Sequence, residues 1–274
     1  MLPTRVGYSA VVDYPASPDL LPSGVLTARR YQARFARTLR DLDAALALRF
    51  EVFNVELGEG LASSFETRRD RDEYDAGCHH LIVSRGNAAE AAVGTYRMQT
   101  SVVAKRHLGF YSASEFDLSG MPAAILDDAV EVGRACVAAE HRNTQVLFLL
   151  WRGLARYVAF NQKRYLFGCC SVSTRDEAVG RSVLRQLERA GHVDRRFDLR
   201  PLPQYALAPV STASAAFDAP LPPLMRLYLR YGARVIGTPA IDRRFGTVDF
   251  FVLFDVARLT QERFRAFFGE GEAS

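Results

Sequence analysis

The chain has 274 residues, of which 49% are hydrophobic and 24% charged, and its formal net charge is +4. This composition is typical of a globular protein, and the length suits one large domain or two small ones. The positive excess is modest and no nucleic-acid-binding motif accompanies it. We therefore expect no nucleic-acid partner and favour an acidic protein or an anionic surface.

The sequence also limits where the protein can work. No window holds 18 uninterrupted apolar residues, and the N-terminus lacks a basic segment followed by a long apolar run. We therefore predict neither a membrane span nor a signal peptide. The four cysteines form no CxxC motif, which suits a reducing cytoplasm.

Residues 1–24 carry four prolines and are expected to form an irregular N-terminal extension, and residues 25–274 a single domain. Residues 66–77 are charged and poor in apolar residues, which predicts a mobile loop. Apolar periodicity and capping residues predict the regular elements. The expected strands are 31–35, 80–84, 91–100, one around 130–136, 165–172, 233–237 and 247–256. The expected helices are 41–57, one from Asn143 or Thr144 to about Asn161, one capped by Ser173 or Thr174 and ended by Gly191, and 224–232.

The strand around residues 130–136 carries an acid and a base three residues apart. Strict alternation sends Glu131 and Arg134 to opposite faces. A bulge at Gly133 would bring both to one face and turn a backbone N–H out of the ladder. A carboxylate that takes an amine proton and an amide aimed at a thioester carbonyl would suit an acyltransferase. The alternative is a surface ion pair beside a permissive glycine.

Seven polar and aromatic residues follow one another along the chain at characteristic spacings. They are Arg49, Phe53, Asp72, Asp75, Arg97, Glu131 and Arg134. In this order they resemble the acyl-homoserine-lactone autoinducer synthases of the GNAT acyltransferase superfamily. Those synthases carry a tryptophan shortly after the matched phenylalanine, whereas the only tryptophan here is Trp151. This departure disfavours adenosylmethionine-dependent lactone synthesis.

Longer segments resemble the acyl-carrier-protein-dependent ornithine N-acyltransferases of bacterial ornithine-lipid synthesis, often labelled hemolysin-like. These segments are LRFEVFNVELG (48–58), VGTYR (93–97), EVGRACV (131–137), LWRGLARYV (150–158), LFGCCS (166–171), LPPLMRLYLRYGA (221–233) and DRRFGTVDFFVLFD (242–255). The resemblance implies an α/β, GNAT-like fold with a mixed, mostly antiparallel twisted sheet flanked by helices. It also implies transfer of a 3-hydroxyacyl chain from acyl-carrier protein to the α-amine of ornithine, the first step of ornithine-lipid synthesis.

The resemblance implies roles for the matched residues. Amine attack on a thioester requires a neutral amine, and a carboxylate can take the proton. We assign this base to Glu131 and expect Arg97 and Arg134 to order the carboxylates. The alternative is that Glu131 is a structural partner of Arg134.

The other matched positions are expected to bind the acceptor. Asp72 and Asp75 are assigned to the cationic groups of ornithine, with a solvated acidic loop as their alternative. Arg49, Phe53 and Glu56 share one stripe of the first helix and are expected to line the acceptor side.

The donor is expected to be an acyl-carrier protein. Coenzyme A-dependent relatives usually have a glycine-rich turn before the central helix, but residues 140–144 contain no glycine. The helix start at Arg142, Asn143 and Thr144 is expected to hold the single phosphate of a phosphopantetheine arm. A basic surface is expected to face the carrier protein, and solvated faces are its alternative. It comprises Arg152, Arg156, Arg29, Arg30, Arg34, Arg37, Arg40, Lys163 and Arg164.

We expect no metal and no other cofactor. Cys78, His79 and His80 have no evident fourth ligand, and Cys169 and Cys170 are expected to be structural. Two further functions remain open: synthesis of another long-chain N-acyl amino acid or autoinducer-like signal, and a noncatalytic acyl-binding or membrane-perturbing role. A peripheral position at the inner membrane is the alternative to a purely cytoplasmic one.

Overall fold

The computed structural model describes residues 14–86, 91–208, 218–262 and 265. The strands are β1 (Leu26–Ala28), β2 (Tyr31–Phe35), β3 (His79–Arg85), β4 (Ala92–Thr100), β5 (Phe116–Asp117), β6 (Ala129–Val137), β7 (Tyr165–Val172), β8 (Val193–Asp194), β9 (Arg200–Pro201), β10 (Arg234–Ile236), β11 (Ala240–Asp242) and β12 (Thr247–Asp255). The helices are α1 (Leu39–Arg49), α2 (Ser64–Thr67), α3 (Ser101–Arg106), α4 (Ala123–Asp127), α5 (Thr144–Phe160), α6 (Glu177–Arg189) and α7 (Pro223–Tyr231). None of these described helices has the length and apolar character needed to cross a membrane.

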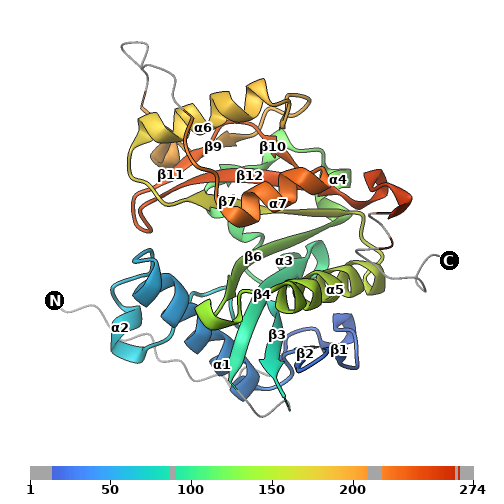
Figure 1. Ribbon diagram of the computed structural model, residues 1–274. Helices are drawn as coiled ribbons and strands as arrows, with labels where there is room; N and C mark the ends of the chain where they lie inside the picture. Colours follow the sequence, from blue (N-terminus) through green and yellow to red (C-terminus); the bar gives the residue numbers. More distant parts are fainter. Residues whose placement is uncertain (1–13, 87–90, 209–217, 263–264, 266–274) are drawn as a thin grey trace.

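One mixed sheet runs through the molecule (Figure 1). Its strand order is β1-β2-β3-β4-β6-β7-β12-β10-β8, with β11 beside β12. Two neighbouring pairs, β6 with β7 and β10 with β8, are parallel, and the other pairs are antiparallel. This is the mostly antiparallel sheet flanked by helices that the GNAT-like resemblance implies, so the predicted fold class is confirmed.

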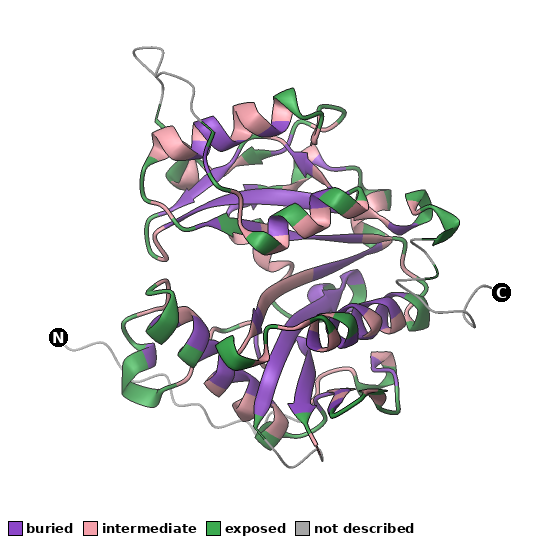
Figure 2. Ribbon diagram, viewed as in Figure 1, coloured by how far each residue is buried: buried purple, intermediate pink, exposed green. Residues whose placement is uncertain are grey.

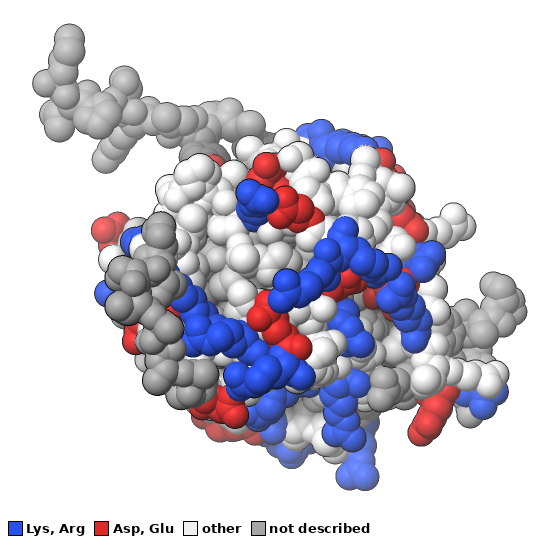
Figure 3. Space-filling model, turned by 90° about the horizontal axis from the view of Figure 1, so that it is seen from above, with Lys and Arg blue, Asp and Glu red and all other residues white. Residues whose placement is uncertain are grey.

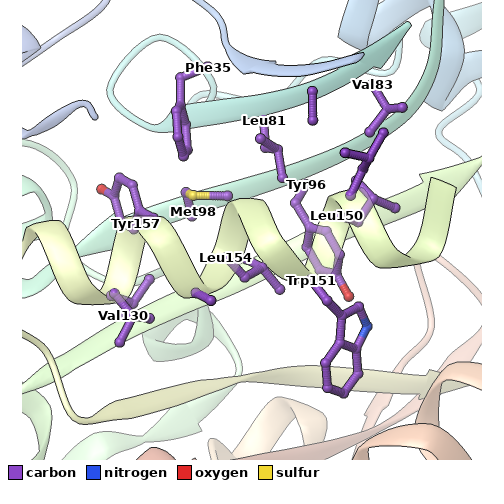
Figure 4. Packing of buried hydrophobic residues seen from close by; sticks show 14 of the residues in the cluster. Phe35, Leu81, Val83, Tyr96, Met98, Val130, Leu150, Trp151, Leu154 and Tyr157 are labelled. Atoms are coloured by element: carbon purple, nitrogen blue, oxygen red, sulfur yellow. The ribbon is translucent and has the colours of Figure 1, made fainter. Parts of the chain in front are cut away.

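The helices cover both faces of the sheet because strand residues alternate between them. Leu81 and Val83 of β3 pack in one cluster with apolar residues of α5, whereas Ile82 packs in another cluster with Leu48 of α1. Figure 4 shows side chains of α5 directed toward those of the central strands. Figure 2 shows that the buried residues concentrate along β4 and β12 and that exposed residues lie on the outer sides of the helices.

The described part of the N-terminal extension is packed against the domain. Residues 14–24 contain only a short 3-10 turn, Pro18–Leu20. Leu21 is buried in the main core, and the carbonyl of Ala16 lies 2.6 Å from Nε2 of His79. Residues 1–13 lie outside the described part of the chain.

The first long helix differs from its prediction in its second half. An α-helix ends at Arg49, and a π-helix continues over Phe50–Glu56. A π-turn holds more residues than an α-turn, so the side-chain stripe predicted from α-helical spacing does not persist beyond Arg49. The helix over Glu177–Arg189 also begins later than predicted, with Asp176 as its N-cap.

The sheet opens between β6 and β7. Their parallel ladder joins only Ala129–Glu131 to Tyr165–Phe167, although both strands continue. A Cβ atom added to Gly168 would lie 2.1 Å from the carbonyl oxygen of Val132, so only glycine fits at this close approach. Beyond this point the two strands separate and leave a cavity between them.

Candidate active site

The cavity has a volume of about 910 Å³ and is lined by residues from both halves of the sheet. Val132, Gly133 and Arg134 of β6 form one wall, and Gly168 and Cys169 of β7 lie opposite. The apolar part of the lining, which we call the apolar arm, includes Trp151, Leu154, Tyr228, Val252 and Phe254. The polar part, which we call the polar arm, includes Arg97, Gln99, Glu115, Glu131, Arg134 and Asp249. The lining therefore offers contacts both to an apolar chain and to a charged group.

The bulge predicted in β6 is present, one residue further along than expected. Gly133 pairs with Arg97 and Cys136 with Thr95, so Arg134 and Ala135 together oppose a single residue of β4. Arg134 itself takes the left-handed conformation, with φ of 49°. The extra residue turns the guanidinium toward the polar arm, where it lies 4.7 Å from the ring centroid of Phe245.

Glu131 lines the cavity but does not pair with Arg134. Its carboxylate accepts hydrogen bonds from Nε2 of Gln99 (2.7 Å) and from the backbone N–H groups of Tyr111 (2.8 Å) and Ser112 (2.7 Å). These donors fix the 3-10 turn Tyr111–Ser114 against β6. Most acceptor positions of the carboxylate are therefore occupied. Its assignment as the catalytic base stays a prediction, and its contacts give it a positioning role in addition.

A buried ion network lies beside the cavity. Arg49, which is fully buried, donates to Asp70 and Asp75, and Nη1 of Arg97 lies 2.5 Å from Asp72 and 2.9 Å from Asp75. Burial alone would raise the pKa of Asp75, but Arg49 and Arg97 outweigh it and hold that pKa well below its usual range. Burial would also raise the pKa of Asp72, but the charge of Arg97 outweighs it and lowers that pKa.

This network corrects two predicted roles. Arg49 does not line the cavity, so it cannot contact an acceptor there. Asp75 is likewise buried and already paired with two arginines, so it is not available for an ammonium of the acceptor. The charged stretch 66–77 is held by buried ion pairs and is not the solvated, mobile loop that its composition predicts. Asp72 is only 15% exposed and already paired with Arg97.

Sequence reasoning missed two members of the network. Asp70 is buried and lies 3.8 Å from the guanidinium of Arg134, and Nε2 of His80 lies 3.5 Å from Asp75. Burial lowers the pKa of His80 and, to about 4, that of His79. Nδ1 of His79 also lies 2.7 Å from the hydroxyl of Tyr157.

The predicted donor-phosphate residues are engaged elsewhere. Arg142 forms a 2.6 Å ion pair with Glu56, and neither residue lines the cavity. Asn143 is the N-cap of α5, and its side chain accepts from the backbone N–H groups of Gln145 and Val146. The helix start is therefore already capped by its own side chain. The structure thus separates Glu56 from the acceptor side and leaves Asn143 and Thr144 without direct access to the cavity.

The predicted carrier-protein surface is brought together in part. Arg29 and Arg30 lie at the turn between β1 and β2, and α5, which carries Arg152 and Arg156, packs against both strands. These arginines have no carboxylate partner in the described part of the chain. By contrast, Arg34, Arg37, Lys163 and Arg164 are held by internal contacts. Figure 3 shows basic side chains, with acidic ones among them, on the face of the molecule seen from above.

Sequence reasoning also missed a buried pair of acids in the polar arm. Glu115 follows the turn that Glu131 holds, and Asp249 lies on β12. Both line the cavity, and one oxygen of each, Oε2 of Glu115 and Oδ1 of Asp249, has no hydrogen-bond partner. Burial and the neighbouring carboxylates raise the pKa of Glu115 well above its ordinary value and that of Asp249 to about 6. Asp242 lies close enough that ligand atoms of all three acids fall within 4.8 Å of one another.

The raised pKa predicts how Asp249 affects folding. The unfolded chain releases this proton near pH 4, whereas the folded chain keeps it until about pH 6, so stability falls as the pH rises through that interval. Asp249→Asn cannot ionise and should escape this loss. We expect the free energy of unfolding of the variant, relative to wild type, to increase by on the order of 2 kcal/mol between pH 4 and pH 8.

Urea denaturation at several pH values measures this difference. Asp198→Asn is the control, because the Asp198 carboxylate is exposed and pairs with Arg200 at the surface. The free energy of unfolding of Asp198→Asn, relative to wild type, should not increase with pH. A difference for Asp249→Asn that is also constant from pH 4 to pH 8 would contradict the raised pKa.

The cysteines near the cavity are not poised as nucleophiles. Cys78, Cys136, Cys169 and Cys170 are all free thiols. Burial raises the pKa of Cys170 to about 12 and that of Cys169 well above its usual value. Because the thiolate is the reactive form, these side chains are suited to packing, as predicted from the sequence.

The chain is similar in sequence to known acyltransferases. The family model described as Acetyltransferase (GNAT) domain matches residues 48–152. The L-ornithine N(alpha)-acyltransferase of Rhizobium meliloti (strain 1021) is 34% identical over 250 residues, which cover 84% of this chain and 81% of that protein. The L-ornithine N(alpha)-acyltransferase of Agrobacterium fabrum (strain C58 / ATCC 33970) is 31% identical over 253 residues, with coverage of 88% and 86%.

Among solved structures, FeeM, an N-acyl amino acid synthase from uncultured soil microbes, matches with a TM-score of 0.48 and 12% identity. The match covers 84% of this chain and 92% of that one.

Proposed function

This chain belongs to the L-ornithine N(alpha)-acyltransferase family and is an acyltransferase, and we propose that it moves a 3-hydroxyacyl chain from acyl-carrier protein to the α-amine of ornithine. The observation that carries the proposal is the cavity at the opening between β6 and β7. Its apolar arm suits a fatty acyl chain, and its charged arm suits an amino acid.

The strand edge at the opening suits the donor. Beyond Glu131, the edge of β6 that faces β7 has no ladder partner in the described structure. An extended phosphopantetheine arm carries amide groups and can pair with such an edge as a further strand would. That arrangement would place the thioester near the bulge at Arg134, with the acyl chain toward Trp151 and Leu154.

The reaction needs one proton transfer in each direction. The amine nitrogen of ornithine attacks the thioester carbonyl carbon, the carbon–sulfur bond breaks, and an amide forms. The amine loses a proton to a base, and the leaving sulfur gains one. Glu131 lies in the polar arm and is our candidate for the base. The Arg134 guanidinium, with 14% of its side chain exposed and only loose contacts to Asp70 and Asp72, is our candidate for the ornithine carboxylate.

Two features favour a carrier protein over coenzyme A as the donor. The turn before α5 has no glycine and is closed by the Asn143 cap, so it offers no cradle for a pyrophosphate. Arg29, Arg30, Arg152 and Arg156 form a basic surface along α5 and the β1–β2 turn, and carrier proteins are acidic. The phosphopantetheine thioester would then be a substrate, with no resident cofactor.

The test is a transfer assay with purified protein, ornithine and a 3-hydroxyacyl-carrier protein, in which mass spectrometry detects N-acylornithine and free carrier protein. We expect turnover with this donor and much weaker turnover with coenzyme A carrying the same chain. Reversing the charge of Arg152 and Arg156 together should raise the KM for the carrier protein and reduce its salt dependence. Equal use of both donors without salt dependence would contradict the carrier-protein assignment, and absence of N-acylornithine with either donor would contradict the proposed function.

A further inference from the structure

Ornithine differs from most amino-acid acceptors by a second ammonium group, and the polar arm has few acids that can receive it. The described acids that line the cavity are Glu59, Glu115, Glu131 and Asp249. Glu131 already accepts from three donors, and Glu59, at the rim, accepts from the hydroxyl of Ser173. The aspartates of the neighbouring network are neutralised by arginines. Glu115 and Asp249 therefore remain.

These two carboxylates are built into the fold. Glu115 is 2% exposed and Asp249 is 4% exposed, and no ion pair joins either of them to a basic side chain of the described residues. Oδ2 of Asp249 accepts a hydrogen bond from the hydroxyl of Thr247. Oδ1 of Asp249 and Oε2 of Glu115 have no hydrogen-bond partner. Burial without a cationic partner disfavours the ionised form of these two acids, and a bound cation would favour it.

The third acid of the group has a different function. Oδ1 of Asp242 accepts from the backbone N–H groups of Arg244 and Phe245, so it orders the turn between β11 and β12. That turn carries Phe245, whose ring contacts the Arg134 guanidinium. The turn thus connects the acid pair on one side with the candidate carboxylate-binding arginine on the other.

We propose that Glu115 and Asp249 bind the side-chain ammonium of the acceptor and so select a diamino acid over a monoamino acid. This inference rests on the proposed function and adds the residues that determine acceptor specificity. Charge-assisted hydrogen bonds from one ammonium would satisfy both unpartnered oxygens. The α-amine would then lie at the opening between β6 and β7, where the thioester is proposed to lie.

The experiment compares ornithine with norvaline, which has the same carbon skeleton but no side-chain amine. We measure kcat/KM for both acceptors with the carrier-protein donor, using wild type, Glu115→Gln and Asp249→Asn. Each variant should lose about 10- to 100-fold on ornithine, the value of a charged hydrogen bond, and change little on norvaline. Asp198→Asn, with its exposed carboxylate, should behave as wild type on both acceptors.

Ligand-induced stabilisation gives a second readout that does not depend on turnover. Ornithine should raise the Tm of wild type more than norvaline does, and this difference should disappear in Asp249→Asn. Equal losses on both acceptors, or unchanged preference for ornithine in both variants, would overturn the inference.

Two more outcomes separate this inference from its alternatives. If EDTA abolishes wild-type activity and Mg²⁺ restores it, the acids hold a metal ion and the ammonium assignment is overturned. If wild type acylates neither ornithine nor norvaline, the proposed function fails and the inference fails with it. If wild type acylates ornithine and the variants keep their preference, only the inference fails.

Discussion

Arg49→Met should lower the free energy of unfolding by about 3–5 kcal/mol, as is usual when one partner of a buried ion pair is removed. The substitution keeps the apolar bulk of the side chain but leaves Asp70 and Asp75 with one cationic partner fewer in a buried site. Urea denaturation at pH 7 measures the change, and circular dichroism reports whether the variant folds.

The control for this loss is Arg68→Met. Arg68 pairs with Glu51 at the surface, where the two side chains are 70% and 52% exposed. Exposed pairs contribute less than about 1 kcal/mol, so this variant should be close to wild type. A loss of the same small size for Arg49→Met would show that the ion network does not stabilise the fold.

Glu131→Gln should lower kcat/KM for ornithine by about 100-fold or more, the usual effect of removing a positioned acid–base group. Glutamine has one acceptor oxygen where the carboxylate has two, so it cannot receive both backbone N–H groups of Tyr111 and Ser112 together with Gln99 in the present arrangement. The turn that leads to Glu115 should move as a result. Near-normal turnover would contradict a catalytic or positioning role.

The pH dependence of the residual activity distinguishes these two roles. If Glu131 is the base, the acidic limb of the kcat/KM profile should disappear in the variant. If Glu131 positions the turn, that limb should remain and the KM for ornithine should rise. Glu66→Gln, at an exposed position on α2, is the matched control and should have the wild-type profile.

Elements with strong periodicity were predicted well from the sequence. The strand over 165–172 and the helix that starts after Asn143 were found at their expected positions, because a continuous apolar run and a capping residue are local signals. The bulge in β6 was also expected, although Arg134 and not Gly133 takes the left-handed conformation. A glycine indicates where the backbone can bend, but packing decides which residue does so.

Tertiary pairing was not visible in the sequence. The stretch 66–77 has the composition of a solvated loop, yet Asp70 and Asp75 are buried because two arginines from distant elements reach them. The π-helix after Arg49 changes the direction of Glu56 in a way that no α-helical spacing indicates. Asp249 lies in an apolar strand, and only the fold shows that its carboxylate is close to that of Glu115 in the cavity lining.

The protonated thiols of Cys169 and Cys170 bear on how the acyl group is transferred. Because burial holds Cys169 and Cys170 in the protonated form, neither is suited to carry the acyl group between donor and acceptor. Direct transfer, with no acyl group held on these thiols, requires the donor and the acceptor to be bound together. Under the proposed function, the carrier-protein thioester and ornithine would therefore meet in the cavity for the acyl group to pass directly from one to the other.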